Sequence, residues 1–535
     1  MNQINHSSDH HEIYLRMTNR KKTLSILIAF HILLFTATFA QFAGGSGTSS
    51  DPYQIGTAAQ LAELATVTNA GDTAFNNKHY KLIADIDLSV YGPSNIAFND
   101  GEGWIPIGFS EYVLLYFDSC GYSYAMETEI GKPFKGNFNG NNKIVSGLYI
   151  EYQQFTEKKT IECVGLFGYI DGGMVENLGI VNGHIIGRKG CGSVAGYINN
   201  GSNITNCYFT GLASGNNTGG VVGSVSNNSS VTSCYSVSSI GGYTAGGVTG
   251  SISDTSSITN CYSIGTVSGG SNAGGVTGIV YNNCSITNCY SMGMVNGYFA
   301  GGVAGFVSDN CNITNCYSTS IVVSDYYSTY LVAGGVASFL DNNSIITNCV
   351  ALNPSVKGFS DYTGRVLGGS NNDFTLSNNA AWDGMLNKAD DTIWNNKGCT
   401  NRDGKDMSTV AINADGTLGG RFTAADGWTT QNGKLPGLFG NTVDMPVHLL
   451  TTNRLPNGAI NATYLKISPN PTTGELRVTS DKLPMEDIQI FDVLGRRLPF
   501  YQEKNEGEMK TDISHLAAGV YFLQVDGIIR KVIKN

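Results

Sequence analysis

The middle of the chain repeats one pattern of short apolar runs separated by polar turns. Between Gly165 and Cys349, a glycine box, an aliphatic position, an Asn-rich turn and an Asn/Ser-Cys pair recur in the same order. A fixed period of this size indicates a solenoid, in which each repeat buries its apolar face against its neighbours. The steps between successive cysteines are 27, 27, 28, 27 and 33 residues, from Cys207 through Cys234, Cys261, Cys289 and Cys316 to Cys349.

The composition of the repeats indicates strands rather than helices. Residues 190–356 contain no Lys, Arg, His or Glu. Their Gly, Ser, Thr, Asn, Val, Ile and Tyr are turn and strand formers, whereas a helical repeat would use Ala, Leu, Glu and Lys. We therefore predict a parallel β-helix with two or three short strands in each coil, right-handed because crossovers between parallel strands are right-handed by default.

Stacking of the coils predicts ladders of equivalent residues. The asparagine before each cysteine suits a bend, where its side-chain amide can satisfy neighbouring backbone groups. Its positions are Asn206, Asn260, Asn288, Asn315 and Asn348, with Ser233 as the exception. The predicted aliphatic ladder consists of Ile204, Val231, Ile258, Ile286, Ile313 and Ile346.

The repeat also carries a resemblance to a known family. The G-L-F-G box at 165–168 recurs as G-G-V-x-G and is followed by I-T-N-C-Y. This pattern resembles the GLUG-motif repeats of bacterial secreted proteins, over roughly residues 160–350. Such repeats occur beside IgA-cleaving metallopeptidase domains and in surface or adhesin-like proteins, and they are not themselves catalytic. The resemblance therefore implies a repeat type and not an activity.

The N-terminus predicts export. Residues 18–40 combine a basic stretch, an apolar core and small residues before a cleavage site between Ala40 and Gln41, as in a secretory signal peptide. Residues 1–16 form a long polar extension, so we expect Met17 to be the natural start. No other apolar segment approaches 18 residues, and we expect no transmembrane segment in the mature chain.

The regions that flank the repeats have their own patterns. We assign 41–160 to an N-terminal cap and first coils, with a short amphipathic helix at 57–65 that covers the open end of the solenoid. The order of motifs there looks like the start of GLUG and pectate-lyase-like β-helices. We assign 161–350 to the repeats, 351–445 to the last coils and a C-terminal cap, and 446–464 to a linker.

Residues 465–535 predict a separate small β-sandwich, similar to an immunoglobulin fold, because short alternating strands are separated by turn signals. The sequence closely resembles the type A sorting domain of type IX secretion in Bacteroidota. That resemblance implies the type IX machinery as a partner, and a secreted or outer-membrane surface location. The motif residues that carry it are Pro469, Asn470, Pro471, Asp492, Gly495, Arg496, Gly519 and Tyr521.

Charge and motifs disfavour several classes of function. The net charge of −10 gives no basic footprint for nucleic acid. His11-Glu12 is followed by Leu15 rather than histidine, so the metallopeptidase H-E-x-x-H motif is missing. Asp254 and Asp309 occupy equivalent turns two coils apart, and we interpret them as turn-capping residues. We expect no catalytic residue, metal or cofactor in the repeats.

An enzyme remains an alternative at the edges of the solenoid. Its site would need acid, base or metal groups that converge around Arg188, Lys189 and the insertion at 100–135. We expect a protein that is not an enzyme, and keep a polysaccharide-active enzyme as the rival hypothesis.

Twelve cysteines allow two interpretations. The six that recur once per coil are predicted to stack as free, buried thiols, because side chains in register point in parallel and bridge poorly. Cys284 and Cys311 form an extra pair one repeat apart at a turn. We predict these two as the site of a disulfide, if the chain has one.

The tyrosine after each cysteine gives the candidate ligand site. Stacked rings that face outward beside Ser and Thr would suit sugar binding, whereas rings that face inward would belong to the core; both alternatives stay open. We expect a secreted or cell-surface scaffold for adhesion or for binding carbohydrate, host or matrix proteins, with a purely structural role as a further alternative. The predicted ligand-binding residues are Tyr208, Tyr235, Tyr262, Tyr290 and Tyr317.

Overall fold

The structure is a computed structural model, and its described residues begin at Gln41. The predicted signal peptide, Met17 and Ala40 lie outside them. The described solenoid ranges are 41–112, 116–117, 123–124, 129–152, 162–324, 331–358, 362–371 and 373–450. In the C-terminal domain they are 465–469, 472–480, 488–491, 497–498, 500–505, 508–516, 519–525 and 528–534.

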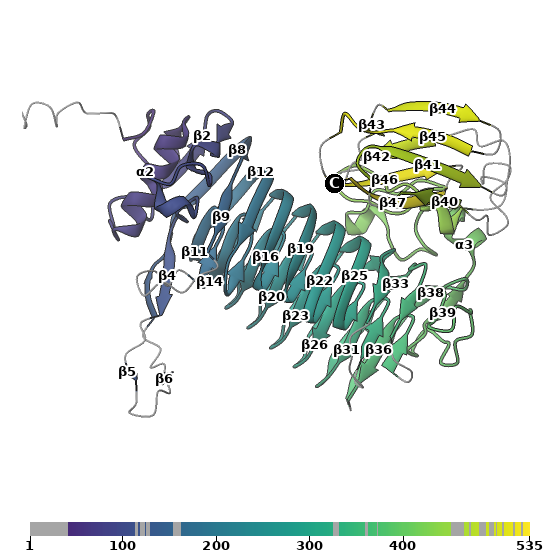
Figure 1. Cartoon of the computed structure of the whole chain (residues 1–535). Coiled ribbons are helices and arrows are strands. Elements are labelled where there is room, and N and C mark those ends of the chain that lie inside the picture. Colours follow the sequence, from purple (N-terminus) through teal and green to yellow (C-terminus); the bar gives the residue numbers. More distant parts are fainter. Residues whose placement is uncertain are drawn as a thin grey trace, which may run out of the picture.

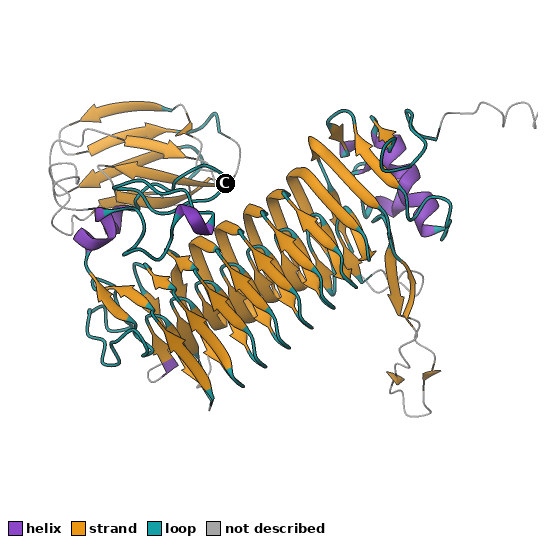
Figure 2. Ribbon diagram, turned by 180° about the vertical axis from the view of Figure 1, so that it is seen from behind, coloured by secondary structure: helices purple, strands orange, loops and turns teal. Residues whose placement is uncertain are grey.

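The predicted β-helix is confirmed. The chain winds into a parallel β-solenoid of about 11 turns, which appears as an elongated stack of strands (Figures 1 and 2). One face is an eight-stranded parallel sheet to which successive coils each give one strand. These strands are β11 (Phe167–Asp171), β14 (Ala195–Asn199), β17 (Val222–Val225), β20 (Thr249–Ile252), β23 (Thr277–Val280), β26 (Ala304–Val307), β31 (Ala337–Leu340) and β36 (Leu367–Ser370).

The remaining faces are formed by a second parallel sheet. Its short strands carry the I-T motif, or V-T in β18 and L-S in β37: β15 (Asn203–Thr205), β18 (Ser230–Thr232), β21 (Ser257–Thr259), β24 (Ser285–Thr287), β27 (Asn312–Thr314), β32 (Ser344–Thr347) and β37 (Phe374–Ser377). Its long strands are β12 (Met174–Ile186) and four strands that each start directly after the cysteine of the bend: β16 (Tyr208–Gly219), β19 (Tyr235–Gly246), β22 (Tyr262–Gly274) and β25 (Tyr290–Gly301).

Shorter strands continue these rows to both sides. Before and among the long strands lie β10 (Cys163–Val164) and β13 (Gly190–Cys191). Toward the C-terminus lie β28 (Tyr317–Ser318), β29 (Ile321–Val323), β30 (Val332–Gly334), β33 (Val350–Ala351), β34 (Val356–Lys357), β35 (Thr363–Gly364), β38 (Ala380–Trp382) and β39 (Lys405–Met407).

The aliphatic ladder lies in register and forms the core. Ile204, Val231 and Ile258 pair directly across successive strands and have no exposed surface. The file continues through Ile286 and Ile313 and on to later coils. A β-branched side chain packs well on the pleated surface of a strand, so one such residue per coil gives a continuous apolar column.

The asparagine bend has the geometry that the sequence predicts. Asn206, Asn260 and Asn288 have φ of 51°, 54° and 53°, in the left-handed region that asparagine tolerates better than most residues. Ser233 takes the same conformation. The Asn206 Nδ2 donates to Asn177 Oδ1 of the preceding coil at 2.7 Å, so the amides also join neighbouring coils. We call this file the asparagine ladder.

The N-terminal end is closed by the expected helix. Helix α2 (Ala58–Asn69) is capped by Thr57, whose hydroxyl accepts from Gln60 N at 3.2 Å, and it buries Leu61 and Leu64. The first coils contain β1 (Tyr53–Ile55), β2 (His79–Leu82), β3 (Ile86–Asp87), β8 (Asn137–Ser146) and β9 (Tyr149–Glu151), with short 3₁₀ turns at Ser89–Tyr91 and Asn99–Gly101.

The insertion at 100–135 contains two antiparallel strand pairs. Strand β4 (Phe109–Tyr112) pairs with β7 (Glu129–Lys132), and β5 (Tyr116–Phe117) pairs with β6 (Ser123–Tyr124). Strand β4 of the first pair is visible beside the first coils in Figure 1. Within this insertion, Trp104 is buried and its Nε1 donates to Leu166 O at 3.1 Å.

The C-terminal domain is the predicted β-sandwich. One antiparallel sheet contains β40 (Leu465–Ser468), β41 (Glu475–Ser480), β45 (Glu508–Asp512) and β44 (Tyr501–Asn505). The other contains β43 (Arg497–Leu498), β42 (Ile488–Phe491), β46 (Gly519–Val525) and β47 (Ile528–Lys534). Of the motif residues, Asn470, Pro471, Asp492, Gly495 and Arg496 lie outside the described residues, whereas Tyr521 belongs to the buried core of the sandwich.

Candidate functional site

The five predicted tyrosines form one continuous stack. They pair in register from β16 to β28, and neighbouring ring centroids lie 5.0, 4.8, 4.7 and 5.0 Å apart with interplanar angles of 8° or less. The stack arises because the residue after the cysteine bend opens the long strand in every coil. We call Tyr208, Tyr235, Tyr262, Tyr290 and Tyr317 the tyrosine ladder.

The ladder lies outside the core of the solenoid, and its C-terminal half is covered. Tyr290 and Tyr317 belong to a second apolar cluster built from residues after the last coil, including Phe422 and Trp428. Tyr317 has no exposed surface, and its hydroxyl donates to Pro436 O at 2.7 Å. The residues that cover the ladder, 408–450, form α3 (Thr409–Ala414), two 3₁₀ turns (Ala424–Asp426 and Val447–Leu449) and connecting loops. We call them the covering segment.

The covering segment is held by aromatic packing. The Phe422 and Tyr317 rings meet edge-on, with centroids 5.6 Å apart. The ring centroid of Trp428 lies 5.8 Å from that of Tyr317 and 6.3 Å from that of Tyr290. Large aromatic side chains bury much apolar surface in such arrangements. This burial supplies most of the free energy that holds the covering segment in place.

The asparagine ladder provides the polar part of the same contact. Asn288 Nδ2 donates to Asp426 O at 2.8 Å, and its Oδ1 accepts from Trp428 Nε1 at 3.3 Å. Further along, Asn348 Nδ2 donates to Arg421 O at 3.2 Å. The bend that shapes each coil therefore also positions the covering segment.

The N-terminal half of the ladder is left partly exposed, beside one further aromatic ring. Phe439 is 42% exposed, and its ring lies 6.2 Å from that of Tyr235 and 5.9 Å from that of Tyr262, tilted by 39° to both. Its φ is 59°, which is rare for a bulky residue and costs conformational energy. We call Tyr235, Tyr262 and Phe439 the aromatic corner.

The geometry of the corner decides what it can contact. Faces of the ladder rings are turned toward one another, and Tyr208 lies against Gly179, where an added Cβ would meet its Cζ at 2.4 Å. The ladder therefore presents ring edges and hydroxyls, and Phe439 presents exposed ring surface. Burial raises the pKa of Tyr208, Tyr235 and Tyr262, so these hydroxyls stay protonated at neutral pH and can both donate and accept hydrogen bonds.

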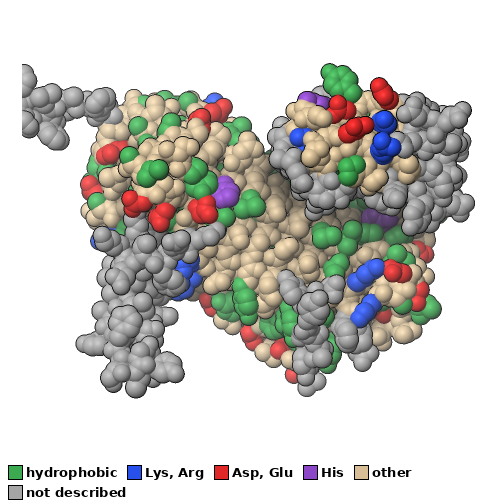
Figure 3. Space-filling view, in the orientation of Figure 1, with side chains coloured by type: hydrophobic (Ala, Val, Ile, Leu, Met, Phe, Trp, Pro, Cys, Tyr) green, Lys and Arg blue, Asp and Glu red, His purple; other side chains and the backbone are tan. Residues whose placement is uncertain are grey.

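The surface of the central coils carries few charges. Figure 3 shows mainly neutral side chains and backbone there, with some acidic side chains along the lower edge. This distribution follows from the absence of Lys, Arg, His and Glu in residues 190–356.

Cys284 and Cys311 belong to a ladder of small polar residues at the second turn. Along this file each backbone N–H donates to the side chain of the next coil: Ser202 to Ser229, Ser229 to Ser256, Cys284 to Cys311 and Cys311 to Ser344, at 3.1–3.2 Å. We call it the serine ladder. Both thiols are buried and free in the structure, and the disulfide between them stays a prediction.

The cysteine ladder has the same construction in the core. Cys207, Cys234 and Cys289 each donate a backbone N–H to the sulfur of the next coil at 3.4 Å, and all six thiols are buried. Burial raises the pKa of Cys234, which keeps this thiol protonated and unreactive.

The acidic turn residues bond to their neighbours. Asp254 accepts from Asn282 Nδ2 and from Ser226 Oγ, each at 3.0 Å, and the Asn282 bond holds its pKa below the usual range. Asp309 accepts from Asn342 Nδ2 at 2.8 Å. These contacts join adjacent coils, as turn-capping residues do.

Two paired contacts lie at the N-terminal edge of the solenoid, near the place where the rival hypothesis puts an enzyme site. Lys189 Nζ lies 2.5 Å from Glu162 Oε2, and His184 stacks on Tyr149 with ring centroids 4.9 Å apart. Within the described ranges, no group of three or more His, Cys, Asp or Glu side chains is arranged to hold a metal ion.

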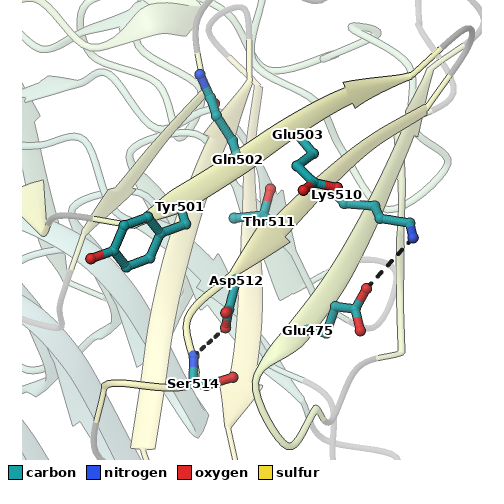
Figure 4. A pocket seen from close by; sticks show the side chains of 8 residues that line it. All are labelled: Glu475, Tyr501, Gln502, Glu503, Lys510, Thr511, Asp512 and Ser514. Carbon is teal, nitrogen blue, oxygen red and sulfur yellow. Dashed lines mark hydrogen bonds and ion pairs between the residues drawn. The ribbon is translucent and has the colours of Figure 1, made fainter.

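The C-terminal domain has a shallow pocket of about 280 Å³ on one sheet (Figure 4). Lys510 Nζ lies 3.9 Å from Glu475 Oε1, and Ser514 N donates to Asp512 Oδ1 at 2.7 Å. Tyr501 stands at its edge and is 75% exposed. Comparison with known sequences assigns this domain: residues 466–535 match the family described as secretion system C-terminal sorting domain.

The chain carries a type IX secretion sorting domain. A protein with this domain is exported, so it is secreted or lies at the cell surface. The type IX machinery is its partner in export. In the part of the chain that the structure describes, no helix is long and apolar enough to cross a membrane.

Two further relatives match about a third of the chain each. Halomucin of Haloquadratum walsbyi is 33% identical over 174 residues, which are 32% of this chain and 2% of halomucin. A putative Gly-rich membrane protein of Evansella cellulosilytica is 28% identical over 177 residues, which are 31% of this chain and 16% of that protein. The chain therefore spans less than a fifth of either relative.

One solved structure covers most of the chain. An IgA1 protease chain aligns with 89% of this chain and 34% of its own length, at 13% identity and a TM-score of 0.35. A score this low supports no inference about activity.

Proposed function

We propose that this protein is an adhesion scaffold that binds carbohydrate at the aromatic corner after export by a member of the Bacteroidota. In this proposal its repeats are of the GLUG type and display the corner on a rigid rod. Host or matrix glycans are the expected ligands.

The exposed Phe439 is the observation that supports this proposal most. Its backbone has φ of 59°, a conformation that glycine or asparagine adopts at lower cost. Its side chain is 42% exposed, so it contributes little to the core. Strained backbone of this kind concentrates at sites where a side chain must be presented to a ligand.

The surroundings of the corner suit a neutral sugar. The apolar C–H face of a sugar ring can pack on exposed aromatic surface, and sugar hydroxyls can exchange hydrogen bonds with the protonated hydroxyls of Tyr235 and Tyr262. Few charges lie near the central coils, so no strong field selects an ionic ligand there.

The proposal is tested by glycan-array binding of the mature chain, residues 41–535. The variant Phe439→Gly removes the ring and fits the left-handed backbone, so we expect stability within about 1 kcal/mol of the parent. We expect binding to fall at least tenfold, because the exposed ring surface is lost.

A matched control uses another outward stack. Tyr197 on β14, in the other parallel sheet, stacks on Tyr169 with ring centroids 5.2 Å apart, and Tyr197→Ala should bind like the parent. Equal binding by Phe439→Gly and the parent would remove the corner as the site. If the parent binds no glycan, a purely structural role becomes the better hypothesis, and cleavage of an arrayed glycan would favour an enzyme.

A further inference from the structure

A pocket of about 430 Å³ lies on the outer face of the first coils, at the end opposite the covering segment. Strands β2, β8 and β12 form its floor, and the loop at Ser49 and Ser50 forms its wall. This volume lies in the range of about 300–1,000 Å³ that is typical of small-molecule sites.

Register places six side chains of the floor in a grid of two files. Within β2 and β8, His79 and Lys81 flank the buried Tyr80, and Asn137 and Asn139 flank the buried Phe138. Because side chains alternate across a strand, the flanking residues all point outward. The files run His79–Asn137–Met174 and Lys81–Asn139–Glu176, with neighbours about 4.8 Å apart across the strands.

The hydrogen bonds within the grid leave one charge available. Asn139 Nδ2 donates to Glu176 Oε1 at 2.6 Å, and Asn137 Nδ2 lies 3.5 Å from His79 Nε2. Among the described residues, Lys81 forms no ion pair. Its ammonium group therefore has donors that a ligand can use.

The charged lining is confined to this end of the solenoid. In the two coils after the pocket, the same files carry Asn203 and Thr205, and then Ser230 and Thr232. Residues 190–356 contain no Lys, Arg, His or Glu, so none of these coils repeats the charged lining. The pocket thus differs in chemistry from the rest of a face that is otherwise regular.

We propose that this pocket binds an acidic sugar, with the carboxylate or sulfate of the sugar held by Lys81 and His79. The amides of Asn137 and Asn139 and the carboxylate of Glu176 hold its hydroxyls. This site is separate from the aromatic corner and does not rest on the function proposed for that corner. It gives the protein a second specificity, for an anionic glycan.

The test is calorimetric titration of the mature chain with glucuronate, a sulfated glucose and neutral glucose. We expect both anionic sugars to bind at least tenfold more tightly than glucose. Lys81→Met keeps the aliphatic stem and removes the charge, so it should abolish this preference. Lys143→Met, on the neighbouring strand β8 and outside the pocket lining, should behave like the parent.

The following outcomes distinguish the acidic-sugar pocket from the aromatic corner. Anionic binding that survives Lys81→Met, or equal binding of glucose and glucuronate, would overturn the acidic-sugar site. Phe439→Gly should leave glucuronate binding unchanged, since the corner is not part of the pocket. Loss of array binding in Phe439→Gly together with no uronate binding by the parent would support the corner and reject the pocket.

Discussion

The two halves of the tyrosine ladder have the same residue in the same register but different surroundings. Tyr290 and Tyr317 are 4% and 0% exposed beneath the covering segment, whereas Tyr208 and Tyr235 stay partly exposed. Their ring spacings are almost equal, so the ladder itself does not distinguish them. The two halves differ because the covering segment packs over Tyr290 and Tyr317. One repeated feature thus serves as a packing surface at one end and as a candidate binding surface at the other.

The largest expected effect is a difference in stability between the halves. Tyr317→Ala should lower the free energy of unfolding by about 3–5 kcal/mol, because it removes a fully buried aromatic ring and leaves a cavity. Tyr208→Ala should cost clearly less, since its ring is partly exposed. Urea denaturation of both variants measures the difference, and equal losses would show that the covering segment does not bury the C-terminal half.

Alkaline pH should act on the covered half. Burial holds the pKa of Tyr290 and of Tyr317 above the usual value of about 10, so their contribution to stability is complete below pH 10. Above it, stability should fall by about 1.4 kcal/mol per pH unit for each tyrosine that stays protonated. The double variant Tyr290→Phe/Tyr317→Phe should make this slope shallower in urea unfolding followed at pH 9–11, while other tyrosines with a raised pKa, such as Tyr262, keep part of it. An unchanged slope would contradict the burial of these hydroxyls.

The asparagine ladder offers a matched pair of smaller size. Asn288 and Asn260 share one hydrogen bond, and both have positive φ, so replacement by Ala removes that bond and adds similar strain in each. Asn288→Ala also loses the contacts to Asp426 and Trp428, and should cost about 1–2 kcal/mol more than Asn260→Ala. If the two variants unfold at the same urea concentration, these bonds contribute nothing to docking.

The serine ladder predicts the smallest effect. The double variant Cys284→Ser/Cys311→Ser restores the residue type of Ser229 and Ser256, and should change stability by less than about 1 kcal/mol. Thermal unfolding with and without reductant provides the measurement. The disulfide would instead be established if the double variant lost about 2–4 kcal/mol of stability and the parent had a mass 2 Da lower before reduction than after it.

The repeat made most of the solenoid predictable. Its period placed Ile204 and Val231 in one column and Asn206 at a bend, because every coil solves the same packing problem with the same residues. The sorting domain was predictable for a different reason, since its motif at Pro469 and Gly519 resembles a known domain.

The candidate site was only half predictable. The sequence located the tyrosine ladder but left its direction open, since the position after a bend can face either way. It gave no sign that Phe439 or Trp428 returns to coils more than a hundred residues earlier, because the covering segment has no period to align with them. Cys284 and Cys311 did carry a usable signal, since they occupy the repeat positions of Ser229 and Ser256.

The most direct test of the difference between the two halves is tyrosine nitration mapped by mass spectrometry. We expect tetranitromethane to modify Tyr208 and Tyr235 and to leave Tyr290 and Tyr317 unmodified in the folded chain. A glycan identified on the array should protect Tyr235 and Tyr262 from modification. Nitration of Tyr317 as fast as Tyr208, or no protection by a bound glycan, would contradict the division of the ladder into a covered half and a binding half.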